Sequence, residues 1–153
     1  MCALTNMVTP KVERDAEARN YGRFQIHPLE SGFGMTLGNS LRRVLLSSLE
    51  GAAITSVRIS DVPHEFTHIP GVREDVIQVM LQTKQIRLIM HEGDVAHMHL
   101  AVRGEGVITA ADIQTTAEIE IVNPDLYLFT MDDNKARLEI DFVVERGRGY
   151  SPS

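Results

Sequence analysis

The glycine-rich stretch before residue 40 contains the first residue types that could support chemistry. Gly32, Gly34 and Gly38 lie between a predicted strand and a predicted helix, where dinucleotide-binding proteins carry a glycine-rich turn. That turn follows the pattern G-x-G-x-x-G, and here Leu37 occupies the position of the third glycine. We therefore expect these glycines to form a turn that directs the helix, and not a nucleotide site.

Two further patterns resemble metal sites but lack the ligands that a metal requires. His97 and His99 project to one face of a predicted strand, whereas a zinc site needs three or four ligands. Asp132 and Asn134 match the start of a calcium loop, but Arg137 stands where that loop needs glycine. We expect solvated or hydrogen-bonded histidines, a hairpin turn at 132–135, and no metal or other cofactor.

Two remaining groups could serve catalysis or binding. Ser47 and Ser48 lie on a predicted helix without a neighbouring base, so we predict no catalytic residue. The segment from Arg146 to Tyr150, Arg-Gly-Arg-Gly-Tyr, is typical of an RNA-binding element with a stacking aromatic residue, or of a flexible loop that docks on a protein. Two arginines supply little phosphate affinity in a chain with a net charge of −6, which favours docking.

The composition indicates a globular protein, with 43% hydrophobic and 24% charged residues over 153 positions. This length allows one ordinary domain or two very small ones. No apolar run approaches the roughly 18–20 residues that span a bilayer, and the first residues lack the pattern of a signal peptide. Because Cys2 is the only cysteine, an intramolecular disulfide is impossible. We expect a soluble, cytoplasmic protein.

The elements that must position these groups follow from hydrophobic periodicity and from turn residues. We expect a helix that begins after Met35, with Thr36 as its N-cap, and ends near Leu49. A second helix is expected at 72–83. Strands are expected at 11–18, 21–29, 52–62, 86–91, 95–102, 118–122, 126–131 and 136–145. The predicted class is α+β, with two helices and a largely antiparallel sheet.

The two faces of the first predicted helix differ in character. Leu46 projects from the polar face beside Arg42 and Arg43, a combination that is typical of protein contact surfaces. Gly38 lies on the apolar side, where a glycine costs the helix about 1 kcal/mol relative to alanine. We expect another backbone to approach it closely. The apolar arc itself consists of Leu37, Leu41, Val44, Leu45 and Leu49.

The second predicted helix would place Glu74 and Asp75 in its first turn, where the helix dipole favours negative charge. Its buried stripe is expected to consist of Val72, Val76, Val79, Met80 and Thr83.

Three blocks of the sequence carry patterns that are specific in combination. Within residues 31–46, the stretch from Gly32 on fits G-F-G-x-T-L-G-N-x-L-R-R-x-L-L. Residues 107–113 contain V-T-A-A-D-I with one extra residue after the valine, and residues 146–150 read R-G-R-G-Y. In their order and approximate spacing, these blocks resemble the bacterial RNA polymerase alpha subunit family. The resemblance runs from about residue 10 to the last residue.

The resemblance implies an assembly subunit of DNA-directed RNA polymerase that has no active site of its own. In the family, the N-terminal region forms a homodimer, and its two protomers bind the beta and beta-prime subunits. By matched positions, the dimer and core helix would use Leu37, Gly38, Leu41, Val44 and Leu45. The large-subunit contacts would use Arg42, Arg43, Leu46, Lys84, Arg146, Arg148 and Tyr150.

The resemblance also predicts how the chain divides. Residues 1–50 would form the first part of a two-layer dimerisation subdomain, and residues 51–153 an inserted, mainly antiparallel β-rich subdomain. Family members continue beyond the R-G-R-G-Y block, so we expect this chain to be truncated and to make no direct DNA contact. Two other functions stay open: a free-standing RNA-binding module that uses residues 146–150, and a nucleotide-binding enzyme.

Overall fold

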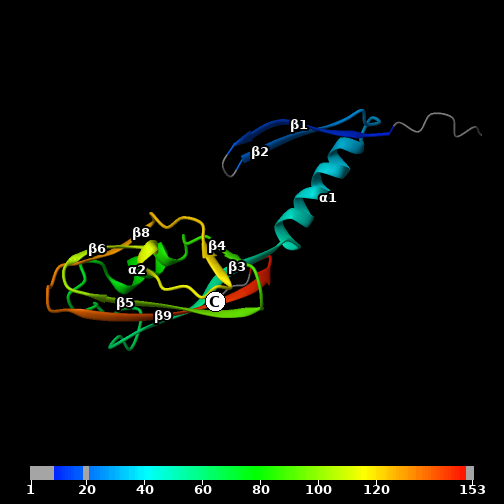
Figure 1. Ribbon diagram of the computed structural model, residues 1–153. Coiled ribbons are helices and arrows are strands. Elements are labelled where there is room, and N and C mark those ends of the chain that lie inside the picture. Colours follow the sequence, from blue (N-terminus) through cyan, green and yellow to red (C-terminus); the bar gives the residue numbers. More distant parts are fainter. Residues whose placement is uncertain (1–8, 19–20, 151–153) are drawn as a thin grey trace, which may run out of the picture. The chain divides into compact units, whose positions relative to one another are not determined.

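The computed structural model describes residues 9–18 and 21–150 of the chain. The chain separates into two compact units, Met1–Ser48 and Leu49–Ser153. The labels of the helices and strands are those of Figure 1. No helix within the described residues is long and apolar enough to cross a membrane.

The first unit consists of a β-hairpin and one helix. Strands β1 (Lys11–Ala18) and β2 (Tyr21–His27) pair antiparallel, and the register shifts between Arg14 and Ala16. Val12, Phe24 and Ile26 lie on the same face of this two-stranded ribbon, as the alternation of side chains along paired strands requires. The helix α1 (Phe33–Ser47) follows.

The expected start of α1 is wrong by three residues. The helix begins at Phe33, and its N-cap is Gly32, not Thr36. Gly32 has a φ of 91°, a left-handed conformation that glycine adopts without a Cβ clash. The helix therefore starts without a side-chain cap, and Thr36 lies inside it. The helix ends at Ser47, two residues before the expected end, and Ser48 is the C-cap.

The second unit contains a five-stranded antiparallel sheet in the order β5-β9-β3-β4-β7. A separate antiparallel pair is formed by β6 and β8. The α+β class with a mainly antiparallel sheet is therefore confirmed. The strands are β3 (Glu50–Ile59), β4 (Leu88–Met90), β5 (Val95–Arg103), β6 (Gly106–Thr109), β7 (Ile119–Ile121), β8 (Tyr127–Met131) and β9 (Arg137–Arg148), and the helical segments are α2 (Val76–Thr83) and η1 (Ala110–Asp112).

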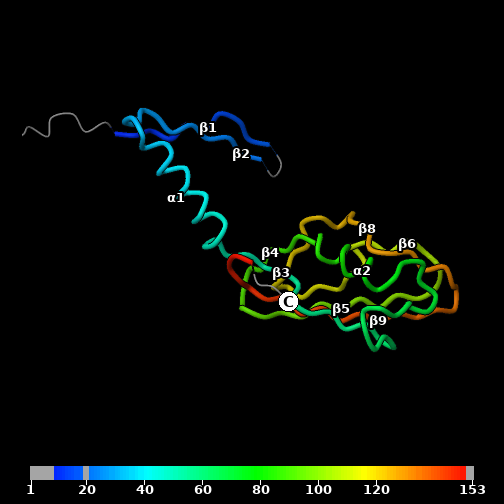
Figure 2. The backbone as a smooth tube through the Cα atoms, turned by 180° about the vertical axis from the view of Figure 1, so that it is seen from behind, coloured from blue at the N-terminus to red at the C-terminus, as the bar shows by residue number. Residues whose placement is uncertain are grey.

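The core of the second unit lies on one face of the large sheet. Figures 1 and 2 show α2 and the β6–β8 pair on this side of β5 and β9. Alternate residues of β9 and β5 point into the core, as the period of two predicts. They are Leu138, Ile140, Phe142 and Val144 on β9, and Ala96, Met98 and Leu100 on β5.

The expected start of the second helix is also wrong. Helix α2 begins at Val76, and Asp75 is its N-cap, so Glu74 precedes the helix instead of lying in its first turn. Val72, Val76, Val79 and Thr83 are buried as expected, but Val72 reaches the core from the preceding loop. Met80 was expected in the buried stripe and is instead exposed.

Two strand predictions need correction. Residues 106–109 form β6, which was not expected. Strand β9 continues to Arg148, through Gly147 of a segment that was expected to be a loop. The reason is pairing, because Gly51, Ala52 and their neighbours on β3 supply backbone partners up to the pair Glu50–Arg148. The expected turn at 132–135 is confirmed, since it joins β8 to β9.

Candidate protein-contact surfaces

The apolar arc of α1 is largely open to solvent. Within the helix Leu37 is half-buried, and Leu41, Val44 and Leu45 are exposed by 42% to 57%. Leu49, which was expected in the same arc, lies beyond the end of α1 and is 59% exposed. No residue of α1 is buried, and none of the other described residues of the first unit is buried either. Hydrophobic side chains of this size gain stability when a partner covers them. This face therefore has the character of an unoccupied contact surface.

The polar face of α1 carries the arginine pair. Arg42 and Arg43 are exposed, and neither makes an ion pair with another described residue. Leu46 beside them is 68% exposed. The Ser47 hydroxyl donates to the Arg43 carbonyl oxygen at 2.6 Å, so this serine is used within the helix. The free guanidinium groups and an exposed leucine provide charge and apolar area together.

Gly38 has no steric reason to be glycine within the described chain. A Cβ atom at this position would meet nothing within 4 Å, and its φ is that of an ordinary helical residue. The close backbone approach expected from the sequence is therefore not made by the described residues. A partner from outside them would have to supply it.

The Arg-Gly-Arg segment is part of the sheet. Arg146 faces Ala52 across the β9–β3 ladder and donates to the Met90 carbonyl oxygen at 3.2 Å. Arg148 pairs with Glu50, and its Nε lies 3.0 Å from the Glu50 Oε1. The hydrogen bond and charge of Arg148 lower the pKa of the Glu50 carboxyl. Glu50 was missed by sequence reasoning because it lies 98 residues from its partner.

Tyr150 and Lys84 are the remaining predicted contact residues. Tyr150 follows Gly149, which has a φ of 68°, and is 90% exposed. Lys84 is the exposed C-cap of α2, where its backbone N–H donates to the Met80 carbonyl oxygen at 3.1 Å. A cation at this position interacts favourably with the helix dipole. The predicted contact residues thus fall in both units, and contact of any of them with a partner stays a prediction.

The predicted histidine pair lies on the outer face of the large sheet. His97 is exposed, and the Nδ1 of His99 lies 2.7 Å from the Asp141 Oδ1 of β9. Among the residues that the structure describes, no group of three or more His, Cys, Asp or Glu side chains could hold a metal ion. Asp132 instead forms a double hydrogen bond with Arg73, at 2.7 and 3.1 Å.

A carboxylate that sequence reasoning did not select fastens the loop before α2 to β8. Glu74 accepts hydrogen bonds from the Tyr127 hydroxyl and, at 2.8 Å, from the Thr130 backbone N–H. Desolvation and the Glu74 hydrogen bond raise the pKa of Tyr127. From the sequence Glu74 was expected in the first turn of the helix, and that position does not predict its hydrogen bonds to residues of β8.

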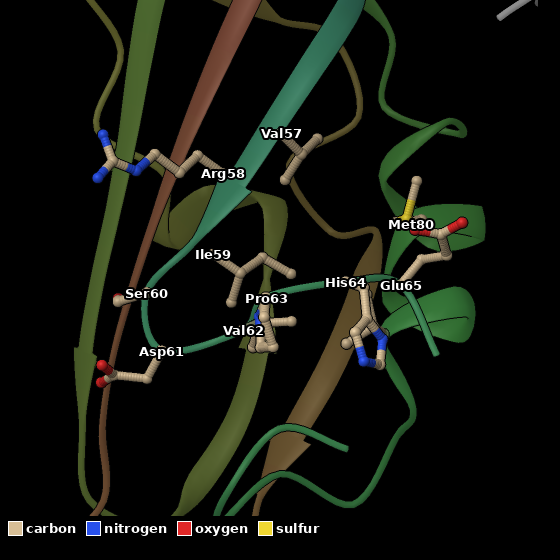
Figure 3. A pocket seen from close by; sticks show the side chains of 11 residues that line it. Val57, Arg58, Ile59, Ser60, Asp61, Val62, Pro63, His64, Glu65 and Met80 are labelled. Carbon is tan, nitrogen blue, oxygen red and sulfur yellow. The ribbon is translucent and has the colours of Figure 1, made fainter. Parts of the chain in front are cut away.

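A groove of about 680 Å³ lies between the end of β3, the loop after it and α2. Figure 3 shows Val57, Ile59 and Met80 directed into this space, whereas Arg58 points away across the sheet. Ile77 and Leu81 of α2 are also exposed. Helix α2 contains no charged residue. The lining of the groove is nevertheless mixed, because Arg58, Asp61, His64 and Glu65 also border it.

Comparison with known proteins identifies the family. Residues 57–153 match the family model described as the RNA polymerase Rpb3/RpoA insert domain. DNA-directed RNA polymerase subunit alpha of Roseiflexus sp. (strain RS-1) is 49% identical over 150 residues, which cover 98% of this chain and 46% of that protein.

The same named subunit of Symbiobacterium thermophilum is 50% identical over 152 residues, covering 98% of this chain and 48% of the relative. That of Saccharopolyspora erythraea is 52% identical over 144 residues, covering 94% and 40%. The chain spans about half the length of the curated relatives it matches. It belongs to the RNA polymerase Rpb3/RpoA insert domain family.

Proposed function

We propose that this chain serves as an assembly subunit of a bacterial DNA-directed RNA polymerase, in the manner of an alpha subunit. Relatives that carry that name match nearly the whole of this chain. The subunit would be non-catalytic and cytoplasmic. It would hold the large beta and beta-prime subunits without supplying any group to nucleotide addition.

The observation that carries the proposal is that none of the described residues of the first unit is buried. A 15-residue helix with three exposed apolar residues in its arc does not satisfy its own hydrophobic surface. Exposed apolar area of this kind marks an interaction site in a soluble protein. We propose that residues 1–50 are the dimerisation part and residues 51–153 the inserted part of such a subunit.

Arg42, Arg43 and Leu46 on the opposite face of α1 support the proposed contact with a large subunit. One helix would then use its apolar arc for a second copy of the chain and its polar face for a large subunit. The RNA-binding alternative has weaker support, because the side chains of both Arg146 and Arg148 are engaged inside the second unit. An RNA-binding element needs its cations free for phosphates.

Co-expression with the beta and beta-prime subunits of a related polymerase tests the proposal. Affinity-tagged chain is expected to retain one or both large subunits through washing in moderate salt. A parallel titration with single-stranded RNA at several salt concentrations is expected to show little binding. Retention of RNA with a steep salt dependence, and of neither large subunit, would instead favour the RNA-binding module.

A further inference from the structure

One edge of β8 is covered by the short segment that precedes α2. The opposite edge of β8 pairs with β6. On the covered edge, Val72 forms an antiparallel bridge with Met131. The Arg73 backbone N–H donates to the Thr130 carbonyl oxygen at 3.0 Å. This segment therefore lies beside β8 in the place where a third strand would lie.

The backbone pairing of the segment with β8 stops one bond short. In a regular antiparallel pair, Arg73 and Thr130 would exchange two N–H···O bonds, one in each direction. The bond from Arg73 is present, but the Thr130 N–H donates to the Glu74 Oε2 at 2.8 Å. The Glu74 carboxylate thus replaces the Arg73 carbonyl oxygen, at the point where the chain leaves β8 to begin α2 at Val76.

The second oxygen of Glu74 also binds a group of β8. The Tyr127 hydroxyl donates to the Glu74 Oε1, and the same hydroxyl oxygen lies 2.7 Å from the Thr130 Oγ1. A carboxylate accepts stronger hydrogen bonds than a carbonyl oxygen does. One side chain therefore holds this end of the segment to β8 through both of its oxygens.

The other end of the segment is fixed beside the turn after β8. The Asp132 N–H donates to the Gly71 carbonyl oxygen at 2.9 Å, and the Asp132 carboxylate accepts two hydrogen bonds from Arg73. Gly71 has a φ of 77°, and a Cβ there would lie 2.6 Å from the Ala136 Cβ, so glycine is required. Residues 71–74, which we call the strap, are thus held at both ends.

Strand β8 has the composition of a segment that pairs readily with copies of itself. Its sequence, Tyr-Leu-Phe-Thr-Met, contains no charged residue and no proline, and Leu126 before it extends the uncharged run. Short segments of high β propensity and low charge stack with identical segments of other chains when an edge is open. Folded proteins prevent such pairing by covering the edge with a loop or a helix.

We propose that the strap keeps β8 from pairing with the same strand of a second copy of the chain, and that Glu74 completes this cover. Release of the strap exposes the backbone groups of Thr130, and β8 of another molecule then supplies the missing N–H···O bonds. The strap lies within the second unit, so its role does not depend on which partners the protein binds. It acts as a barrier to β-sheet aggregation.

Removal of the Glu74 carboxylate from the full chain tests the closure of the edge. Glu74→Ala is expected to speed hydrogen exchange of the Thr130 amide, measured by NMR, by about 10-fold or more, because a bond to a charged acceptor is lost. Glu74→Gln keeps an acceptor oxygen and is expected to retain most of the protection. The matched control is Glu65→Ala, in the loop before the strap, which is expected to change nothing. Unaltered Thr130 exchange in Glu74→Ala would show that the carboxylate does not close the edge.

Aggregation of the same variants tests the barrier. Thioflavin T fluorescence is followed during mild warming, and Glu74→Ala is expected to form β-sheet aggregates several-fold faster than the unaltered chain or Glu65→Ala. Addition of Thr130→Lys to Glu74→Ala is expected to restore the slow rate, because a lysine on an edge strand opposes pairing with another edge. Fast Thr130 exchange in Glu74→Ala without faster aggregation would overturn the proposal. Failure of Thr130→Lys to slow aggregation would also overturn it, since Glu74→Ala would then act only by lowering stability.

Tyr127→Phe decides the question if circular dichroism shows that Glu74→Ala does not fold. This variant removes only the hydroxyl that donates to the Glu74 Oε1. It is expected to speed both Thr130 exchange and aggregation by about 2–5-fold, since one neutral donor is lost. No change in either rate would contradict the role of Glu74 in the strap.

Discussion

At the scale of single residues, the side chains proposed for contact differ in whether their polar atoms already have partners. Arg148 and Arg146 bind a carboxylate and a carbonyl oxygen within the second unit. Arg42 and Arg43 on α1 make no ion pair with another described residue. A partner would therefore find the α1 guanidinium groups available, and it would have to displace internal bonds to use the others.

Substitution of Arg43 by alanine is expected to weaken capture of a large subunit without loss of folding. The side chain is exposed, so its removal leaves no cavity. Loss of one member of a buried, hydrogen-bonded charge pair at an interface costs about 2–5 kcal/mol. Capture by affinity-tagged chain measures the effect, circular dichroism checks folding, and Arg103→Ala on β5 is the control. Normal capture by Arg43→Ala would remove this residue from the contact surface.

The pKa of Glu50 offers a direct test of its pairing with Arg148. The pair lowers the folded-state pKa of Glu50 below its unfolded value, so its stabilising effect is complete above the unfolded pKa and is lost as the pH falls through the folded pKa. An NMR titration of the Glu50 carboxyl carbon is expected to give a lower pKa in the unaltered chain than in Arg148→Gln. Equal values in the two proteins would show that the ion pair does not persist in solution.

At the scale of helices and strands, the two units differ in how their elements are covered. Strand β5 and the part of β9 up to Val144 place a buried residue at every second position, and α2 buries Val76 and Val79. Helix α1 has the same type of amphipathic sequence but no buried residue. An amphipathic sequence therefore predicts that one face of a helix is apolar. It does not predict whether another element of the same chain packs against that face.

The free energy of unfolding should distinguish a truncated core residue of the second unit from a truncated residue on the exposed face of α1. Phe142→Ala on β9 removes a fully buried ring and is expected to lower the free energy of unfolding of the second unit by about 3–5 kcal/mol. Leu45→Ala on α1 changes a residue that is 57% exposed, and this substitution is expected to alter the free energy of unfolding by less than about 0.5 kcal/mol. Denaturant unfolding followed by circular dichroism measures both. A large effect of Leu45→Ala would mean that α1 is packed in solution.

Much of this arrangement was predictable from the sequence, and the exceptions have physical causes. Strand β1 was expected at 11–18 and occupies Lys11–Ala18, where it pairs with β2. The start of α1 was misplaced because a left-handed glycine, not a side-chain cap, begins the helix. The strand through Gly147 was missed because glycine has low strand propensity, and only its pairing with β3 reveals it.

The candidate contact residues were predicted from the sequence largely through a resemblance, and their internal partners were not. The Arg148–Glu50 pair joins residues 98 positions apart, and the bond of Glu74 to Thr130 spans 56. A local sequence pattern cannot predict which residues pair over such long separations along the chain. The groove beside Met80 likewise depends on how α2 lies against β3, which periodicity does not specify.

At the scale of the whole molecule, the chain combines a unit with a hydrophobic core and a unit in which no described residue is buried. The second unit contains all the buried residues among those described, from Ile69 to Val144. The marginal stability of a domain, about 5–15 kcal/mol, leaves little room for several uncovered leucines. We therefore expect the isolated chain to associate with itself at high protein concentration.

The isolated chain is also expected to lack nucleotide-adding activity. Two-metal catalysis needs carboxylates that hold magnesium ions about 3.5–4 Å apart. The sequence has no Asp-x-Asp-x-Asp cluster, and the described residues contain no group of acidic and histidine side chains that could hold a metal. Purified chain would be incubated with template, primer and nucleoside triphosphates. Extension that depends on the chain would contradict its assignment as an assembly subunit.

Hydrogen exchange of the α1 amides, with and without the large subunits, tests the central claim most directly. In dilute isolated chain, residues 33–47 are expected to exchange fast, while the amides of β5 and β9 exchange slowly because their strands are paired and partly buried. Addition of purified beta and beta-prime subunits is expected to slow exchange in α1 and to leave β5 and β9 unchanged. Equal protection of α1 and β9 in a monomeric isolated chain, with no change on addition of the large subunits, would contradict the account.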